Sequence, residues 1–514
     1  MAQFTDAHQL QDVQPTDWAY TALNDLITRY DCLKGYPDGS FRGDRALSRY
    51  EFAAGLNACL QTMERLLAET TADRVTRTDL DTVQRLMQDF ETELAQLENQ
   101  VEGVESRLQF LEDNQFSTTT KLFGQVVVGL QGRASGNADF IDASQNFLGR
   151  DGIQESSDPN NEISLGYNAQ LSLLTQFSPR SFLLTSFQAG NLNTNVTTNF
   201  FGLNNNFTRL GYESDTGNAL SLSDLSYRHL VANNLAVIVG TNGVNPVNVF
   251  RGPSRIESAG FGPLSRFAQR NPIIQIGSTS AGLGFDWQAT PRVSIQGVYS
   301  AAFANTATAG LFRDSYTLGL QAFITPTRDI DVSLYYLNSY SGSSGGLLQT
   351  GVGDEQMSLT SGARLNTDAF GATANWAIAD EITLGTWVGF TDSAQVNFQG
   401  SAQTTNWMFS LQFPDLFAEG NYGAIFFGQP PRIVGSNLKV NGSLSGNIPS
   451  LLRGTLGTEA GGRRDRTLHL EGFYRWRLTD NITLTPGVIV LFNPGHNANN
   501  DTITIGAVRT TFSF

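Results

Sequence analysis

The sequence predicts an all-β transmembrane barrel of about 16 antiparallel strands, preceded by a small α-helical domain and a coiled-coil helix. Charged residues are only 16% of the 514 residues and glycine accounts for 51 of them, whereas an average domain has about 25% charge and ~7% glycine. No stretch of about 18 residues is continuously apolar, so no transmembrane helix is expected. From about residue 120 the hydrophobic period becomes two, which is the period of a β-strand.

Composition and periodicity divide the chain into three expected domains, residues 1–68, 69–115 and 116–514. Residues 1–115 contain 10 Lys and Arg against 21 Asp and Glu, a net charge of −11, whereas the remainder has 23 against 27, a net charge of −4. The acidic excess therefore belongs to the N-terminal part, and it argues against nucleic acid as a partner.

Residues 1–68 have the pattern of two helices around a turn. Leu23 and Ile27 recur at helical spacing in the first helix. A turn follows at Pro37-Asp38-Gly39. Ser48 and Glu51 then form a capping box, which marks the start of the second helix.

The chain has two cysteines, Cys32 and Cys59. No histidine lies near either of them in sequence, so we expect no zinc site. A disulfide between them would stabilise the domain by roughly 3 kcal/mol, because it closes a loop of about 27 residues. Two buried thiols in a small core are the alternative.

Residues 80–111 contain a heptad repeat whose hydrophobic positions alternate spacings of three and four. These positions are Leu80, Val83, Met87, Phe90, Leu94, Leu97, Val101, Val104, Leu108 and Leu111. The pattern predicts a coiled coil, with a lone amphipathic helix as the alternative. The flanking positions are mainly acidic, so two such helices would repel each other, and we expect other parts of the chain to drive assembly.

Alternation of apolar and polar residues continues to the C-terminus in segments of strand length. The segments lie near 121–131, 162–177, 180–189, 218–229, 234–240, 279–288, 291–303, 313–325, 328–340, 365–378, 381–391, 403–412, 421–428, 464–478, 481–492 and 502–514. Their even number and the alternation of short with long connections are typical of an outer-membrane barrel. The pattern breaks phase at Asp224, where we expect a β-bulge.

Enzyme and cofactor motifs are not found in the sequence. There is no phosphate-binding loop and no zinc-protease motif, and His8, His229, His469 and His496 are scattered. A barrel hydrolase would need a Ser/His pair on one face, and His469 has no evident serine partner. We therefore expect no enzymatic activity, no cofactor and no metal.

Several spaced motifs resemble the surface-layer homology (SLH) domain. They are Phe4-x-Asp6, Trp18, Gly35-Tyr36-Pro37-Asp38-Gly39-x-Phe41 and Ser48-Arg49-Tyr50-Glu51. The resemblance implies non-covalent binding to peptidoglycan or its linked polysaccharide through Trp18, Gly35, Tyr36 and Arg49. Arg49 suits this role because a guanidinium pairs bidentately with carboxylates. The alternative is that Trp18 belongs to the core and Arg49 caps a helix.

The whole chain resembles the cyanobacterial outer-membrane porins of the carbohydrate-selective porin family, whose members are also labelled iron uptake porins. An SLH domain, a coiled coil, a strand-rich region and a terminal Phe514 together support the resemblance. It implies a homotrimer in outer-membrane lipid, with the N-terminal domain in the periplasm and with small ions and solutes as cargo. The alternative is a structural tether between outer membrane and cell wall, with a largely plugged barrel.

The pore residues are expected in the longest connection, 241–278, since the loop after the fifth strand of 16-stranded porins commonly folds into the channel. It has Arg251, Arg255, Arg266 and Arg270 against Glu257. Such a cationic constriction predicts a mild preference for anions. The expected lumen wall includes His469, Glu471, Arg475, Arg477 and Arg509. Alternatively, the four loop arginines pair with wall carboxylates and pin the loop.

Overall fold

The structure is a computed structural model that divides into two units, Met1–Gln115 and Phe116–Phe514. In the first unit it describes residues 9–10, 12–14, 20–28, 40–41, 57, 59–62 and 65. In the second unit it describes residues 119–134, 136–138, 156–157, 161–193, 205–252, 256–277, 281–342, 350–354, 364–397, 399–437, 461–463 and 465–514.

The first unit contains the helix α1 (Tyr20–Thr28), which agrees with the expected first helix. Leu10, Leu23 and Ile27 form its buried core. The Phe41 N–H donates to Asp12 Oδ1 at 2.6 Å, which ties the turn region to the segment before the helix. The other expected features of this unit lie outside the described residues and stay predictions. They are Trp18, Cys32 and its disulfide to Cys59, Gly35, Tyr36, Arg49, and the heptad of residues 80–111.

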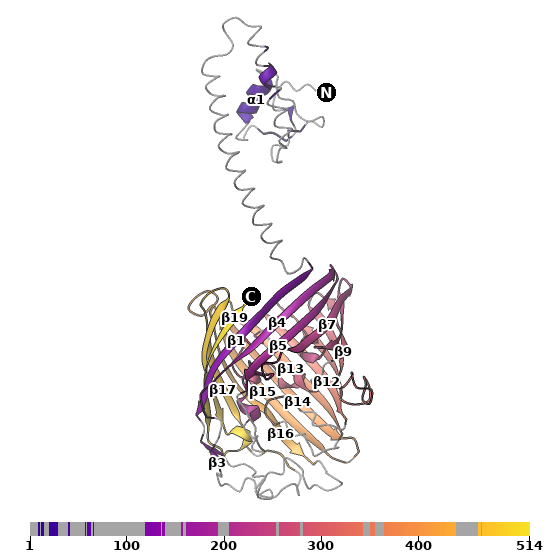
Figure 1. Cartoon of the computed structure of the whole chain (residues 1–514), viewed down its shortest axis with the longest axis vertical. Coiled ribbons are helices and arrows are strands. Elements are labelled where there is room, and N and C mark those ends of the chain that lie inside the picture. The colour runs from indigo at the N-terminus through magenta and orange to yellow at the C-terminus, as the bar shows by residue number, and fades with distance from the viewer. Residues whose placement is uncertain are drawn as a thin grey trace. The chain divides into compact units, whose positions relative to one another are not determined.

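Within the described residues of the second unit, sixteen strands form a closed antiparallel barrel (Figure 1). The bounds of the first eight are β1 (Thr120–Ala134), β4 (Ser164–Ser178), β5 (Ser181–Leu192), β7 (Ser221–Ala232), β8 (Leu235–Asn242), β9 (Ala281–Thr290), β10 (Val293–Ala301) and β11 (Tyr316–Ile324). The last eight are β12 (Ile330–Ser341), β13 (Leu365–Ala379), β14 (Ile382–Gln395), β15 (Ser401–Pro414), β16 (Tyr422–Ser436), β17 (Leu468–Arg477), β18 (Ile482–Phe492) and β19 (Ile503–Ser513). Every strand segment expected from the alternation corresponds to one of these strands, so the predicted barrel is confirmed.

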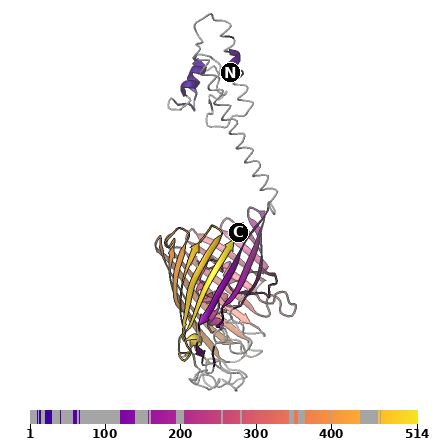
Figure 2. The ribbon, with the colours of Figure 1, turned by 60° about the vertical axis from the view of Figure 1, so that its left-hand side comes forward.

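Neighbouring strands in the chain are neighbours in the barrel, and β1 pairs with both β4 and β19, which closes it (Figure 2). Three short strands lie outside this set: β2 (Asn137–Ala138) pairs with β3 (Ser156–Ser157), and β6 (Ser214–Asp215) pairs with the end of β5. No helix in the described segments has both the length and the hydrophobicity that crossing a bilayer requires.

The bulge expected at Asp224 is present in β7. Asp224 pairs with Ser186 of β5, but the next pair joins Leu222 to Phe187, so Ser223 is an extra residue on the β7 side. A bulge of this kind shifts the alternation by one residue, which explains why the sequence pattern changes phase at this point.

The apolar face of the barrel points outward. Leu318 and Leu320 of β11 are each 52% exposed, whereas Thr317 and Gln321, which flank them, are fully buried. Side chains alternate between the two faces of a strand, so polar residues face the interior and apolar residues face the surroundings. This arrangement is the reverse of a soluble sandwich and matches a barrel in lipid.

Candidate functional site: the barrel lumen and its inserted segments

The described residues of the connection between β8 and β9, 243–252 and 256–277, lie against the inner wall of the barrel. Within its described part it forms α5 (Pro246–Val249), α6 (Arg266–Gln269) and η3 (Pro272–Gln275). Asn271 Nδ2 donates to the Val388 carbonyl of β14 at 2.8 Å, and Thr317 Oγ1 of β11 donates to the Gly277 carbonyl at 3.3 Å. The segment therefore contacts the wall at β11 and β14.

Local sequence explains the three short helices. Each begins after a residue whose side chain accepts a backbone N–H of the first turn: Asn245 before α5, Ser265 before α6 and Asn271 before η3. Such caps satisfy donors that have no partner within the helix. Proline occupies the first turn of α5 and of η3, where its missing N–H costs nothing.

Glu471 of β17 is the main anchor of this loop on the wall. Its side chain is fully buried, and Oε1 accepts the Leu264 N–H at 2.5 Å. The Ser265 N–H lies 3.2 Å from Oε2, and the Ser265 hydroxyl also donates to this carboxylate. These donors offset the cost of burying the charge.

The expected lumen residue His469 has a serine partner after all, since its Nε2 lies 3.2 Å from Ser265 Oγ. The sequence does not reveal this pair, because Ser265 comes from an irregular loop more than 200 residues away from His469. His469 and Glu471 are fully buried, and Ser265 is 2% exposed. The Ser265 hydroxyl is bonded to Glu471, so the cluster holds the loop in place and presents no accessible nucleophile.

Arg509 of β19 is the second anchor, and it is also fully buried. Its guanidinium donates to the carbonyls of Ala259 at 3.0 Å and Gly262 at 2.7 Å. It also lies over the Tyr212 ring, 5.7 Å from the ring centroid. Arg475 of β17 donates to the Phe261 carbonyl at 2.9 Å. Both arginines were expected on the lumen wall, and in the structure they bind the loop backbone.

A second segment, residues 205–213, is inserted beside the first and begins with α4 (Asn205–Thr208). The Gly211 N–H donates to the Leu264 carbonyl at 2.7 Å, and the Arg266 N–H donates to the Arg209 carbonyl at 2.9 Å. The alternation pattern predicts only a long connection between two strands for this stretch. Its one usable signal was the presence of several large apolar residues in an otherwise polar loop.

Two apolar clusters join the inserted segments to the wall. The first involves mainly β14 to β19 and includes Phe207, Leu264, Phe267, Trp387, Phe426, Phe473, Ile489 and Ile505. The second involves mainly β8 to β15 and includes Val249, Phe250, Ile273, Ile276, Tyr335 and Leu337. The inserted segments are therefore packed against the inner wall through apolar side chains.

The loop arginines differ in their surroundings. Arg251 remains 45% exposed, and its Nε donates to Asp286 Oδ2 of β9 at 3.0 Å. Arg270 forms an ion pair with Glu257 at 2.5 Å, inside the loop itself. Arg266 is half-buried, and Arg255 lies outside the described residues. Among the described residues, Arg251 therefore meets a carboxylate of the wall and Arg270 meets one of the loop.

The inner wall of β4 and β5 keeps polar side chains that are only partly buried. They are Gln170, Ser172, Ser186 and Gln188. Ser172 and Ser186 are hydrogen-bonded across the two strands at 2.8 Å, and Gln170 accepts from Gln125 of β1 at 2.7 Å. This part of the lumen surface is neutral and hydrophilic. Arg477, the remaining expected lumen cation, ends β17 and pairs with Asp480 in the following turn.

A buried ion pair joins two long connections, the one between β12 and β13 and the one between β16 and β17. They lie at the end of the barrel that has the long connections, which we call the loop-bearing end. Arg463 Nη2 lies 3.0 Å from Asp354 Oδ1, and both side chains are at most 2% exposed. Asp354 Oδ2 accepts the Ile433 N–H at 3.0 Å. Burial alone would raise the pKa of Asp354, but Arg463, His496 and this hydrogen bond outweigh it and lower the pKa.

His496 completes this polar cluster as a neutral ring. Its Nδ1 accepts the Thr467 N–H at 2.9 Å, so Nε2 holds the proton and donates to the Pro431 carbonyl at 2.9 Å. Burial lowers the pKa of His496 to about 4, although nearby Asp354 acts in the opposite direction. The sequence predicts no role for Asp354, Arg463 or His496, because nothing in their spacing indicates that they meet.

Comparison with known families gives two matches. Residues 77–514 match the family described as carbohydrate-selective porin, OprB family, and residues 10–53 match the S-layer homology domain. These are the two families that the sequence motifs resembled.

Similar proteins are found in cyanobacteria and beyond. A protein of Synechocystis sp. is 34% identical over 545 residues, covering 100% of this chain and 91% of its own length. One of Nostoc sp. is 33% identical over 553 residues, covering 100% and 86%. The outer membrane protein SlpA of Deinococcus radiodurans is 36% identical over 97 residues, covering 19% of this chain and 8% of its own.

Among solved structures, Pseudomonas putida OprB is similar with a TM-score of 0.49 and 13% identity, covering 79% of this chain and 96% of its own. An anion-selective porin from Comamonas acidovorans has a TM-score of 0.42 and 12% identity, covering 77% and 99%.

Proposed function

The chain belongs to the carbohydrate-selective porin (OprB) family of outer-membrane channels, and from this premise we propose that it passes inorganic ions and small hydrophilic solutes by passive diffusion. The observation that supports this most is the inserted loop, which Glu471 and Arg509 hold against one side of the inner wall. The wall of β4 and β5 keeps a neutral, partly exposed polar lining. A lining of amides and hydroxyls suits small hydrated solutes without binding them tightly.

We propose further that the channel has a mild preference for anions. Arg251 keeps nearly half of its side chain exposed, although Asp286 pairs with it. The described part of the loop has one carboxylate, Glu257, which Arg270 already neutralises. The loop therefore keeps a positive excess that guanidinium groups retain at any physiological pH.

Reversal potentials in a salt gradient across a planar bilayer test this preference. The wild-type protein should give a potential of the anion-selective sign, and Arg251→Ala combined with Arg255→Ala should move it towards zero. Arg328→Ala removes an exposed arginine in the turn between β11 and β12 and should leave the potential unchanged. Clear cation selectivity that is the same in all three proteins would refute the proposal.

The alternative function is a structural tether whose barrel is only a membrane anchor. The two apolar clusters inside the barrel favour this function, because closely packed side chains block solutes. Single-channel recordings distinguish the two functions. Stepwise conductance in the wild-type protein supports a diffusion channel, and its complete absence supports a plugged anchor.

We also propose that the N-terminal unit binds peptidoglycan or its linked polysaccharide, with Arg49 as the main contact. The support is the match of residues 10–53 to the S-layer homology domain. In a pull-down of the full chain with purified cell-wall sacculi, Arg49→Ala should bind much less than the wild-type protein. Arg65→Ala, an exposed arginine beyond the matched region, is the matched control. Equal binding by all three proteins would remove Arg49 from the site.

Finally, we propose that the protein assembles as a homotrimer. One solved structural neighbour, OmpT of Vibrio cholerae, is described in a trimer form. Gel filtration with light scattering in detergent measures the oligomeric state directly. A monomer in mild detergent that still conducts would contradict the homotrimer but would leave the proposed channel function intact.

A further inference from the structure

The connection between β10 and β11, residues 302–315, bends outward onto the external face of the barrel. The Tyr299 hydroxyl donates to the Leu311 carbonyl, and the Phe312 ring lies 5.6 Å from the Tyr299 ring. Tyr299 is on the external face, because its cross-strand partners Leu318 and Leu283 are 52% and 58% exposed. The tip of this connection therefore lies outside the barrel and not over its mouth.

The outward tip presents an aromatic ring next to a cation. Phe312 is 75% exposed, which is high for a large apolar side chain. Arg313 follows it, is exposed, and forms no ion pair with any residue that the structure describes. A single exposed phenylalanine is common, but one held in place by Tyr299 beside a free arginine has the composition of an interface anchor.

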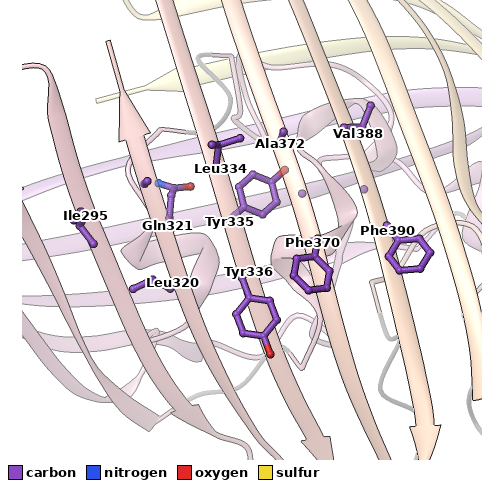
Figure 3. Close-up of a pocket in the computed structure, with 13 residues that line it drawn as sticks. Ile295, Leu320, Gln321, Leu334, Tyr335, Tyr336, Phe370, Ala372, Val388 and Phe390 are labelled. Carbon is purple, nitrogen blue, oxygen red and sulfur yellow. The ribbon is translucent and has the colours of Figure 1, made fainter. Parts of the chain in front are cut away.

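A groove of about 610 Å³ lies on the same external face, across β10 to β14 (Figure 3). Small residues, Ala322 and Ala372, leave space between the larger side chains around them. At one end the rings of Tyr336 and Phe370 lie 5.0 Å apart, and Phe370 is the cross-strand partner of Phe390. Figure 3 shows these three rings in a row over three strands. The groove is apolar and has an aromatic end.

Two carboxylates lie just beyond that aromatic end. Asp368 and Asp392 are direct cross-strand partners on β13 and β14, and each is two residues from an aromatic ring of the groove on the same face, roughly 7 Å along the strand. Asp368 accepts from the Tyr336 hydroxyl at 2.6 Å and Asp392 accepts from Gln403 at 2.8 Å. Neither meets a cation among the described residues. Like charges directly opposite each other are destabilising. A cation from another molecule would therefore stabilise this pair of carboxylates.

We propose that this external face is the contact between copies of the chain, with Phe312 of one copy entering the aromatic end of the groove of the next. Arg313 would then meet Asp368 and Asp392. Phe312 and Arg313 are adjacent in the loop, and the aromatic end of the groove and the two carboxylates are adjacent on the barrel. The two surfaces therefore match in both shape and charge. The proposal rests on the proposed homotrimer and names the surface that forms it.

The positions around the barrel fit a three-fold ring. The outward tip follows the seventh barrel strand, and the two carboxylates are on the tenth and eleventh. About three strand positions of sixteen turn roughly 70° around the barrel axis, close to the ~60° between the directions to the two neighbours in a closed trimer. Each copy can therefore present its tip to one neighbour and its groove to the other.

A charge swap tests the contact in the full-length protein. Arg313→Glu and Asp368→Arg, made singly, should each lose the trimer in gel filtration with light scattering, and the double variant should regain it. Arg328→Glu makes the same charge change in the turn at the opposite end of the strands and is the matched control. Conductance recorded from the same proteins keeps the channel function separate, since neither residue lies in the lumen.

Cysteine cross-linking gives an independent measurement that does not depend on the stability of the variants. Arg313→Cys with Asp368→Cys should form an intermolecular disulfide in membranes, visible as a covalent ladder on a denaturing gel. Intact trimers in both single charge variants together with no cross-link would overturn the assignment, and the groove would then belong to lipid acyl chains. A conducting wild-type monomer would also overturn it while leaving the proposed channel function intact.

Discussion

The Leu264 N–H lies 2.5 Å from Oε1 of Glu471, although 207 residues separate the two and both are fully buried. The inserted loop follows the fifth strand of the barrel, whereas its anchors Glu471 and Arg509 are on the fourteenth and sixteenth strands. The loop can reach its final position only when the last strands are in place. The geometry of the lumen is therefore coupled to closure of the barrel.

Glu471→Gln should loosen the inserted loop. The substitution keeps the shape of the side chain, but it removes the charge and places an amide N–H₂ near the N–H groups of Leu264 and Ser265. Loss of hydrogen bonds to a buried charge costs about 2–3 kcal/mol. We expect a larger and noisier single-channel conductance than in the wild-type protein.

Glu419→Gln is the control for this change, because Glu419 is an exposed residue in the turn between β15 and β16. It should conduct as the wild-type protein does. If Glu471→Gln gave the same conductance and noise as the control, the carboxylate would have no role in positioning the loop.

The strands were predictable because alternation is a local signal that repeats along the chain. The same alternation assigns His469, Glu471 and Arg509 to the polar face of their strands, and all three are buried in the structure. It gave no information about their partners, since Ser265, Leu264 and Gly262 belong to a loop without periodicity. The cluster of Asp354, Arg463 and His496 was missed for a related reason: its members come from three separate long connections, and only the folded barrel brings those connections together.

Asp354→Asn should destabilise the loop-bearing end of the barrel. The substitution removes the carboxylate that forms an ion pair with the buried Arg463. Removing one member of a buried ion pair typically costs 3–5 kcal/mol, because the remaining charge is uncompensated. Hydrogen exchange should show faster exchange of the Ile433 amide, which donates to Asp354. An unchanged exchange rate would mean that water or another group replaces the carboxylate.

Acidic pH should destabilise the cluster of Asp354, Arg463 and His496, because it protonates His496. Its pKa is about 4 in the folded protein against an ordinary value of 6.5, so the neutral ring contributes fully above about pH 6.5. That contribution, roughly 3 kcal/mol, is lost as the pH falls towards 4. The pKa of Asp354 is lowered below its ordinary 3.8, so most of the stability that Asp354 contributes is lost only below about pH 4.

Hydrogen exchange of the Thr467 amide measures this effect, because Thr467 N–H donates to His496 Nδ1. After correction for the intrinsic rate, its protection should fall between pH 6.5 and 4 in the wild-type protein. His496→Gln can still accept and donate, but it does not titrate, so its protection should be flat in this range. An equal pH dependence in both proteins would assign the effect to another group.

Deletion of residues 80–111 should leave the barrel assembled as a trimer. The heptad would extend the chain by roughly 54 Å as a helix over residues 79–114, which suits a spacer between the outer membrane and the wall. Its acidic flanks oppose association, so the contacts that hold copies together are expected on the barrel. Light scattering of the deleted protein in detergent should give the same mass per assembly as the full chain, after allowance for the missing residues. Monomers would show that the coil drives assembly, and the charge-swap variants of Arg313 and Asp368 would then have no effect on a full-length trimer.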